Sequence, residues 1–355
     1  MSKLPETFAP TLKTINERLS ADSLSAYNVC LKLEGEVSQK DVKYARVLGY
    51  MVLYPPSSNA LAKILEEIHS CGGEKATLVK LGKFYVDYYI QGFKKHKTKT
   101  PASSEHASRP SFDKDKDALL AVLKEAPQDR RTAKKQALIR DGYRCVVTGK
   151  YHVEIPASFE VDKEDKSLVG TAFTQCAHIV PEATYFDISD KVSQAKKRDY
   201  SASLLAVLHR FGYNVENING SKVHSLYNVM TLELNVHDAF DRLYLWLEAT
   251  EIENCYNVVN VIGFTLPEKI TFTRPAILSP GFHKESPFPS PELLALHASC
   301  AKVAHLSGAG EYLDELDEDL DEMPVLAADG RSSDVLDHAL LRSLSFMPSL
   351  VDVEV

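Results

Sequence analysis

The stretch "CAHIVPEATYF" (residues 176–186) places one histidine, His178, between small residues at the end of an apolar run that a proline closes. A short apolar run bounded in this way is typical of a β-strand. A histidine at the end of such a strand is either a core side chain or a base that titrates near neutrality. His178 alone does not decide between these roles, so the surrounding pattern has to.

Three other pieces of sequence stand in a fixed order around this histidine. They are "RDGYRCVVTG" (140–149), "YNVMTL" (227–232) and "HDAFD" (237–241). The first ends in Thr-Gly, which indicates a tight turn, and the second has the apolar, β-branched character of a strand. In the third, His237 and Asp241 are four residues apart and would share one face of a helix.

The four ordered pieces resemble the HNH endonuclease family. The resemblance is to the subgroup with Cys-x-x-Thr-Gly, Ala-His-Ile-x-Pro, Asn and His-x-x-Phe-Asp, and it covers about residues 138–260. It implies a ββα-metal site, in which two strands and a helix hold one divalent cation against the scissile phosphate. It also implies metal-dependent hydrolysis of phosphodiester bonds, with DNA as the expected substrate and RNA left open.

The resemblance also assigns roles to individual side chains. His178 would be the general base, and Asn228 would orient that imidazole or tie the connecting loop through its amide. His237 and Asp241 would be the metal ligands. An aspartate is a hard ligand, so we expect Mg²⁺ or Mn²⁺. Phe240, on the same helix, is more simply a core anchor.

One position departs from the family pattern. Many relatives carry Asp or His immediately before the base as a metal ligand, and this chain has Ala177 there. His152, His209 or His224 could supply the missing ligand, or each could be a loop or surface histidine. Ala177 also keeps open an alternative function: a catalytically degenerate HNH fold that binds nucleic acid or protein as a regulatory module.

The cysteines and the apolar segments restrict the setting. Six cysteines are scattered without a Cys-x-x-Cys pair, which favours a reducing, intracellular compartment. Cys145 and Cys176 are predicted to be buried thiols, and no structural zinc is expected. No stretch approaches the roughly 20 apolar residues of a membrane-spanning helix. The short basic run "KKHKTK" (94–99) leaves cytoplasmic and nuclear locations both open.

The net charge of −8 with a pI of about 5.9 does not suggest a nucleic-acid partner. The charge is unevenly distributed, however, because the acidic residues gather in "EYLDELDEDLDEM" (311–323) while residues 129–144 are basic. The basic side chains that could contact phosphates are Arg130, Arg131, Lys134 and Lys135. The alternative is a solvated helix face.

The sequence as a whole predicts an α+β fold with a mainly helical N-terminal region, a central HNH-like domain and a partly disordered acidic C-terminal tail. The expected segments are 1–100 (helical), 101–117 (linker), 118–290 (HNH-like, with an insertion at about 184–224) and 291–355 (a helix and a flexible acidic tail). The N-terminal region or the tail could bind a protein partner.

Overall fold

The computed structural model describes residues 2–6, 20–94, 109–124, 131–182, 195–274 and 286–322. Its helices are α2 (Ala21–Glu36), α3 (Val42–Leu53), α4 (Ser58–Ser70), α5 (Lys75–Tyr85), the π-helix η1 (Val86–Ile90), α6 (Gln91–Phe93), α7 (Arg109–Val122), α8 (Arg131–Arg140), α9 (Lys163–Val169), α10 (Ala195–Arg210), the 3₁₀ turns η4 (Val215–Asn217) and η5 (Gly220–His224), α11 (Leu234–Asp241), α12 (Pro291–Ser307) and α13 (Ala309–Glu322). Its strands are β1 (Tyr151–His152), β2 (Thr171–Ala172), β3 (Thr174–His178), β4 (Val229–Glu233), β5 (Leu245–Ala249), β6 (Cys255–Asn260) and β7 (Lys269–Thr271). The predicted α+β class with a helical N-terminal region is confirmed.

Helix α3 is the centre of the N-terminal region. Every residue of α3 except Lys43 is buried, and the helix packs against α2, α5 and α12. Its contact with α5 is close because Gly82 has no Cβ: one built there would lie 2.5 Å from the backbone oxygen of Tyr44. Any larger residue at this position would push the two helices apart.

The acidic stretch 311–323 differs from the flexible segment expected. Residues up to Glu322 form α13, which packs on α3 and α12. Leu313 and Leu316, three residues apart, are buried, and Asp314 forms an ion pair with Lys94 at 3.0 Å. The leucines give an otherwise charged helix one apolar face, so it docks rather than staying solvated. Residues 323–355 lie outside the described part.

The structure also differs from the expected linker. Residues 109–117 belong to α7, whereas 101–108 lie outside the described ranges. Helix α10, within the predicted insertion, packs against α7 and η1, and Lys116 pairs with Asp199 at 2.8 Å. A second ion pair, between Arg210 and Glu67 at 2.9 Å, is buried and joins α10 to α4. The described part of the insertion is therefore docked on the helical region.

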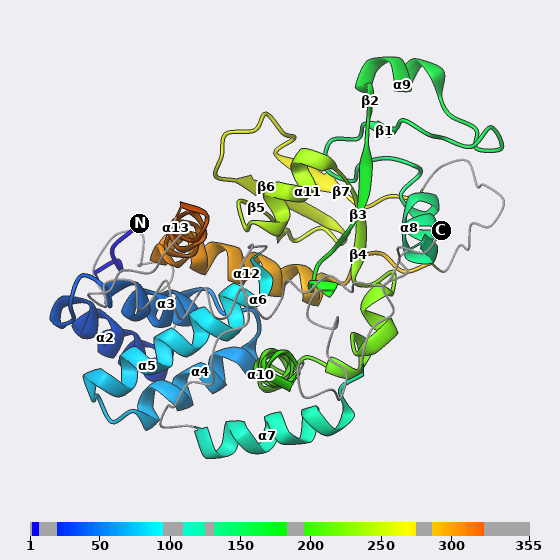
Figure 1. Cartoon of the computed structure of the whole chain (residues 1–355). Helices are drawn as coiled ribbons and strands as arrows, with labels where there is room; N and C mark the ends of the chain where they lie inside the picture. Colours follow the sequence, from blue (N-terminus) through cyan, green and yellow to red (C-terminus); the bar gives the residue numbers. More distant parts are fainter. Residues whose placement is uncertain are drawn as a thin grey trace.

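The strands form three small sheets: the parallel pair β1–β2, the antiparallel hairpin β3–β4 and the antiparallel sheet β5–β6–β7. Helices α11 and α8 flank the β3–β4 hairpin on opposite sides (Figure 1). One cluster of buried side chains runs from Leu4 to Leu316 and joins the helical region to the strands. None of the described helices combines the length and the apolar character that a membrane span requires.

Candidate active site

The β3–β4 hairpin leads directly into α11, which gives a ββα unit. The two strands pair from Thr174 opposite Glu233 to His178 opposite Val229, and α11 begins at the next residue after β4. Because side chains alternate along a strand, Gln175 and Ala177 share one face of β3, and His178 is the last residue of the strand. The strand face that carries Gln175 is turned toward α11, since the Gln175 amide contacts His237 on that helix.

The Cys-x-x-Thr-Gly piece forms a turn against this unit. The amide of Val146 donates to the carbonyl of Thr231 in β4 at 2.9 Å, and Thr148 Oγ1 donates to Glu233 Oε2 at 3.2 Å. Gly149 adopts a positive φ of 73°, which a glycine allows at low cost. The turn thus braces β4 just before α11 begins.

Asn228 ties two loop segments together. Its Oδ1 accepts from the amide of Val180 at 2.8 Å, and its Nδ2 donates to the carbonyls of Val180 at 3.0 Å and Val223 at 2.9 Å. The side chain is fully buried. The Asn228 amide was expected either to orient the His178 imidazole or to tie the connecting loop. These hydrogen bonds tie loop segments together. Since Val180 and Val223 adjoin the segments of His178 and His224, Asn228 fixes how these segments meet.

His237 and Asp241 lie on one face of α11. Their Nε2 and Oδ2 atoms are 3.3 Å apart, and both side chains are partly exposed. Gln175 Oε1 lies 2.8 Å from His237 Nδ1. A glutamine oxygen only accepts, so Nδ1 carries a proton. Nε2 faces Asp241 and holds a lone pair in the neutral imidazole or a second proton in the imidazolium. Gln175 was not predicted as a site residue. It could have been found from its position two residues before Ala177, on the same face of β3.

His178 belongs to a second cluster. Its Nε2 lies 3.0 Å from His224 Nδ1, and Glu182 Oε2 is 3.8 Å from each of these nitrogens. All three side chains are largely buried, with 5% of His178, 9% of His224 and 11% of Glu182 exposed. His224 thus lies beside the predicted base, not beside the predicted ligands.

The other two histidines that could have supplied a ligand lie elsewhere. His152 is buried, and its Nδ1 lies 3.0 Å from Thr174 Oγ1. Burial lowers its pKa below the ordinary value, with Lys134 adding to the shift. His209 is exposed near the end of α10. Ala177 is fully buried and belongs to the main core cluster.

Helix α8 carries the basic residues that were predicted to contact phosphates. Arg131, Lys134 and Lys135 are exposed, while Ala133 and Ala137 pack on the hairpin. Arg130 lies outside the described residues. The basic side chains therefore occupy the face of α8 that the hairpin leaves open.

A buried ion pair fixes α8 against β4. Arg140 binds both carboxylate oxygens of Asp141, at 2.7 and 2.9 Å, and donates to the carbonyls of Leu226 and Val229. Asp141 Oδ2 also accepts from the amide of Thr231 at 2.9 Å. This network holds the basic helix at a set orientation to the strand that follows Asn228.

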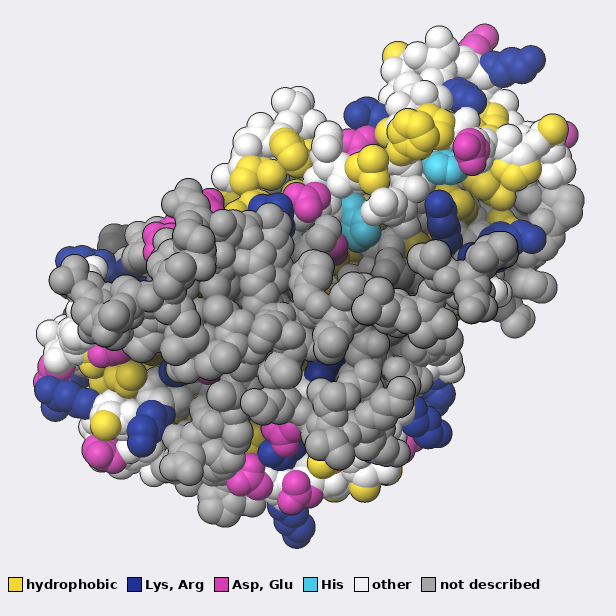
Figure 2. All heavy atoms as spheres, viewed as in Figure 1, with side chains coloured by type: hydrophobic (Ala, Val, Ile, Leu, Met, Phe, Trp, Pro, Cys, Tyr) yellow, Lys and Arg dark blue, Asp and Glu magenta, His cyan; other side chains and the backbone are white. Residues whose placement is uncertain are grey.

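Histidine and hydrophobic side chains reach the surface together in the strand-rich part of the molecule, at the upper right of Figure 2. Phe173 comes just before β3 and is 63% exposed. Leu234 is the first residue of α11 and is 45% exposed. Leu234 precedes His237 by one helical turn. The candidate ligands therefore border an apolar surface.

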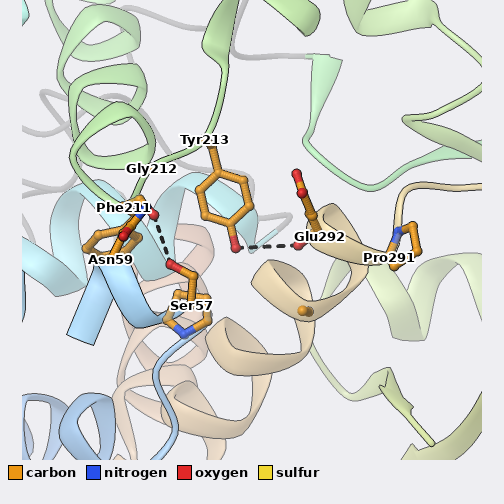
Figure 3. Close-up of a pocket in the computed structure, with 9 residues that line it drawn as sticks. Ser57, Asn59, Phe211, Gly212, Tyr213, Pro291 and Glu292 are labelled. Carbon is orange, nitrogen blue, oxygen red and sulfur yellow. Dashed lines mark hydrogen bonds between the residues drawn. The ribbon is translucent and has the colours of Figure 1, made fainter. Parts of the chain in front are cut away.

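A separate pocket of about 370 Å³ lies among α4, α10 and α12 (Figure 3). Two hydrogen bonds cross it: Ser57 Oγ donates to the carbonyl of Phe211 at 2.8 Å, and the Tyr213 hydroxyl donates to the carbonyl of Glu292 at 3.4 Å. None of the predicted site residues lines it. These two hydrogen bonds tie the segment after α10 to the starts of α4 and α12.

Comparison with known proteins agrees with the ββα unit. Residues 145–248 match the family model described as HNH endonuclease. The chain carries an HNH endonuclease domain. The match includes His178, Asn228, His237 and Asp241, and HNH endonucleases in general cleave nucleic acids with the help of a divalent metal. A search of curated proteins and a search of solved structures each found no match.

Proposed function

We propose that the HNH domain hydrolyses phosphodiester bonds of DNA with Mg²⁺ or Mn²⁺, and that His178 acts as the general base. The observation that carries this proposal is a pair of possible metal-ligand atoms on α11: His237 Nε2 and Asp241 Oδ2 lie 3.3 Å apart. Two ligand atoms that bind one ion at about 2.1 Å in octahedral geometry lie about 3 Å apart. The pair therefore fits a small divalent cation, and Gln175 holds His237 in the tautomer that binds one.

A divalent ion bound at this pair would supply charge neutralisation at a nonbridging phosphate oxygen. The protein supplies the base. If His178 donates its Nε2 proton to His224 Nδ1, its Nδ1 keeps a lone pair and can accept a proton from the attacking water. His224 is then a positioning residue that fixes the tautomer of the base.

Asn228 is also a positioning residue in this proposal. Its three hydrogen bonds hold the segments of His178 and His224 at a fixed separation. The exposed charges of Arg131, Lys134 and Lys135 on α8, with Arg130, would attract the phosphate backbone without reading bases. This arrangement favours cleavage with little dependence on sequence.

Nicking of supercoiled plasmid tests the proposal. The purified chain is incubated with Mg²⁺, Mn²⁺ or EDTA beside folded His178→Ala and His237→Ala variants, with His209→Ala as a control that loses an exposed histidine. We expect metal-dependent nicking by the wild type and by His209→Ala, and none by His178→Ala or His237→Ala. Equal nicking by the wild type and His178→Ala would exclude His178 as the base.

Ala177 supports a second candidate function, an HNH fold that binds nucleic acid or protein without cutting. Ala177 offers no ligand and is fully buried. This function predicts no nicking and no Mg²⁺- or Mn²⁺-dependent thermal shift that His237→Ala removes. It would still allow nucleic-acid binding that weakens with salt.

A further inference from the structure

His178, Glu182 and His224 come from two places in the chain, because His178 and Glu182 are four residues apart. His178 ends β3, Glu182 follows the next proline, and His224 ends the 3₁₀ turn η5. Within the described ranges they form the group of three possible metal ligands whose ligand atoms all lie within 4.8 Å of one another. They share no ligand atom with the pair on α11.

The distances within this cluster suit a tetrahedral ion. The nitrogens of His178 and His224 are 3.0 Å apart, and each is 3.8 Å from Glu182 Oε2. Tetrahedral bonds of about 2.0–2.1 Å place neighbouring ligand atoms roughly 3.3–3.4 Å apart. Shifts of a few tenths of an ångström would bring all three atoms to that spacing.

The chemistry of the ligands selects the ion. Two imidazole nitrogens and one carboxylate oxygen are a ligand set of Zn²⁺, whereas Mg²⁺ takes oxygen ligands. Burial favours the same occupant, because a cation stabilises a carboxylate that is removed from water. Asn228 adds preorganisation, since it ties Val180, near His178 and Glu182, to Val223, the neighbour of His224.

We propose that His178, Glu182 and His224 bind Zn²⁺, and that the bound Zn²⁺ silences the nuclease. The inhibitory part rests on the proposed function, whereas the binding site does not. A neutral imidazole has one lone pair, so when Zn²⁺ takes Nε2 of His178 the proton stays on Nδ1. Neither nitrogen can then accept a proton from water. Three protein ligands leave a fourth position for water.

Metal titration of the full chain tests the site itself. The protein is stripped with EDTA, and Co²⁺ is followed by its visible absorption while Zn²⁺ is measured by competition with it. We expect one tightly bound equivalent in the wild type, in His237→Ala and in the control His209→Ala. His224→Ala should bind at least about 100-fold more weakly, and the isosteric Glu182→Gln at least about tenfold, because each loses a direct ligand.

Wild-type affinity in both His224→Ala and Glu182→Gln would overturn the site, as would loss of binding in His237→Ala alone. Folding of each variant is checked by circular dichroism, and Glu182→Gln keeps the test decisive should His224→Ala fail to fold. Excess Mg²⁺ should leave the Co²⁺ spectrum unchanged. Displacement by Mg²⁺ would also count against the site.

Nicking with Mg²⁺ in the presence and absence of one equivalent of Zn²⁺ tests inhibition. Each protein is compared with itself, so the basal rate of a variant does not matter. We expect Zn²⁺ to abolish nicking by the wild type and to leave any residual nicking by His224→Ala unchanged. Nicking by the zinc-bound wild type would overturn the inhibitory part. Absence of nicking under every condition would instead refute the proposed function and leave the titration to judge the zinc site.

Discussion

Replacing Asn228 with alanine should destabilise the HNH domain by about 3 kcal/mol, at roughly 1 kcal/mol for each of three lost hydrogen bonds. The partners are backbone groups of Val180 and Val223, both fully buried, so water cannot replace the amide without reorganisation. Asn228→Asp would keep the acceptor for the Val180 amide but would place a carboxylate oxygen against two carbonyls. We expect it to cost at least as much.

Urea unfolding followed by circular dichroism and by the fluorescence of Trp246, the one tryptophan in the chain, measures this loss. Trp246 lies buried in β5. The matched control is Asn260→Ala, which removes two side-chain hydrogen bonds to Phe264 at an exposed position and should cost less than about 1 kcal/mol. A loss in Asn228→Ala no larger than in this control would refute the view that the amide holds the two segments.

Three other expectations follow from the contacts described. Burial lowers the pKa of His297 from 6.5 to about 4, so the unfolded chain takes up this proton first as the pH falls. Stability should be full above about pH 6.5 and decrease by roughly 3 kcal/mol toward pH 4, and His297→Gln should flatten the dependence of the urea midpoint on pH. Gln175→Ala should weaken Mn²⁺ binding about 10- to 100-fold in calorimetric titration, and an unchanged affinity would exclude its orienting role. Lys134→Ala and Lys135→Ala should each reduce the salt slope of DNA binding by about 1, whereas an unaltered slope would indicate a solvated helix face.

Local sequence was enough to predict strands and a shared helix face, whereas their assembly into a ββα unit was implied by the family resemblance. The apolar runs at β3 and β4 need only alternation and β-branched residues, and the four-residue spacing of His237 and Asp241 needs only the helical period. The break after α8 is also local, because Gly142, two residues beyond the helix, adopts a φ of 66° that favours glycine. Each of these signals lies within about ten residues of its effect.

Charged helices were harder to predict from their sequences. Residues 163–169 form α9, which Asp162 caps by accepting from the amides of Glu164 and Asp165. Helix α13 was missed because two buried leucines among acidic side chains give a weak apolar pattern. Tertiary packing on α3, which no local window contains, makes that pattern sufficient.

The partners of the site histidines could not be predicted, because they depend on tertiary contacts. His224 is 46 residues from His178, and their 3.0 Å contact requires the connecting segment to return beside β3. Gln175 is 62 residues from His237 and depends on how α11 packs against the hairpin. The sequence supplied the residue types, and the fold decided which of them meet.

The alanine at position 177 has a consequence for metal selection. It removes one possible carboxylate from the face of β3 toward α11, and Gln175 on that face is neutral and already engaged with His237. The α11 pair therefore offers one negative charge, and a hard ion there would depend on water and substrate phosphate for its other ligands. The cluster around His178 offers three protein ligands of the kind that Zn²⁺ prefers. If both proposals hold, Zn²⁺ binds more tightly than the catalytic ion, so the activity of the HNH domain depends on free Zn²⁺ staying low.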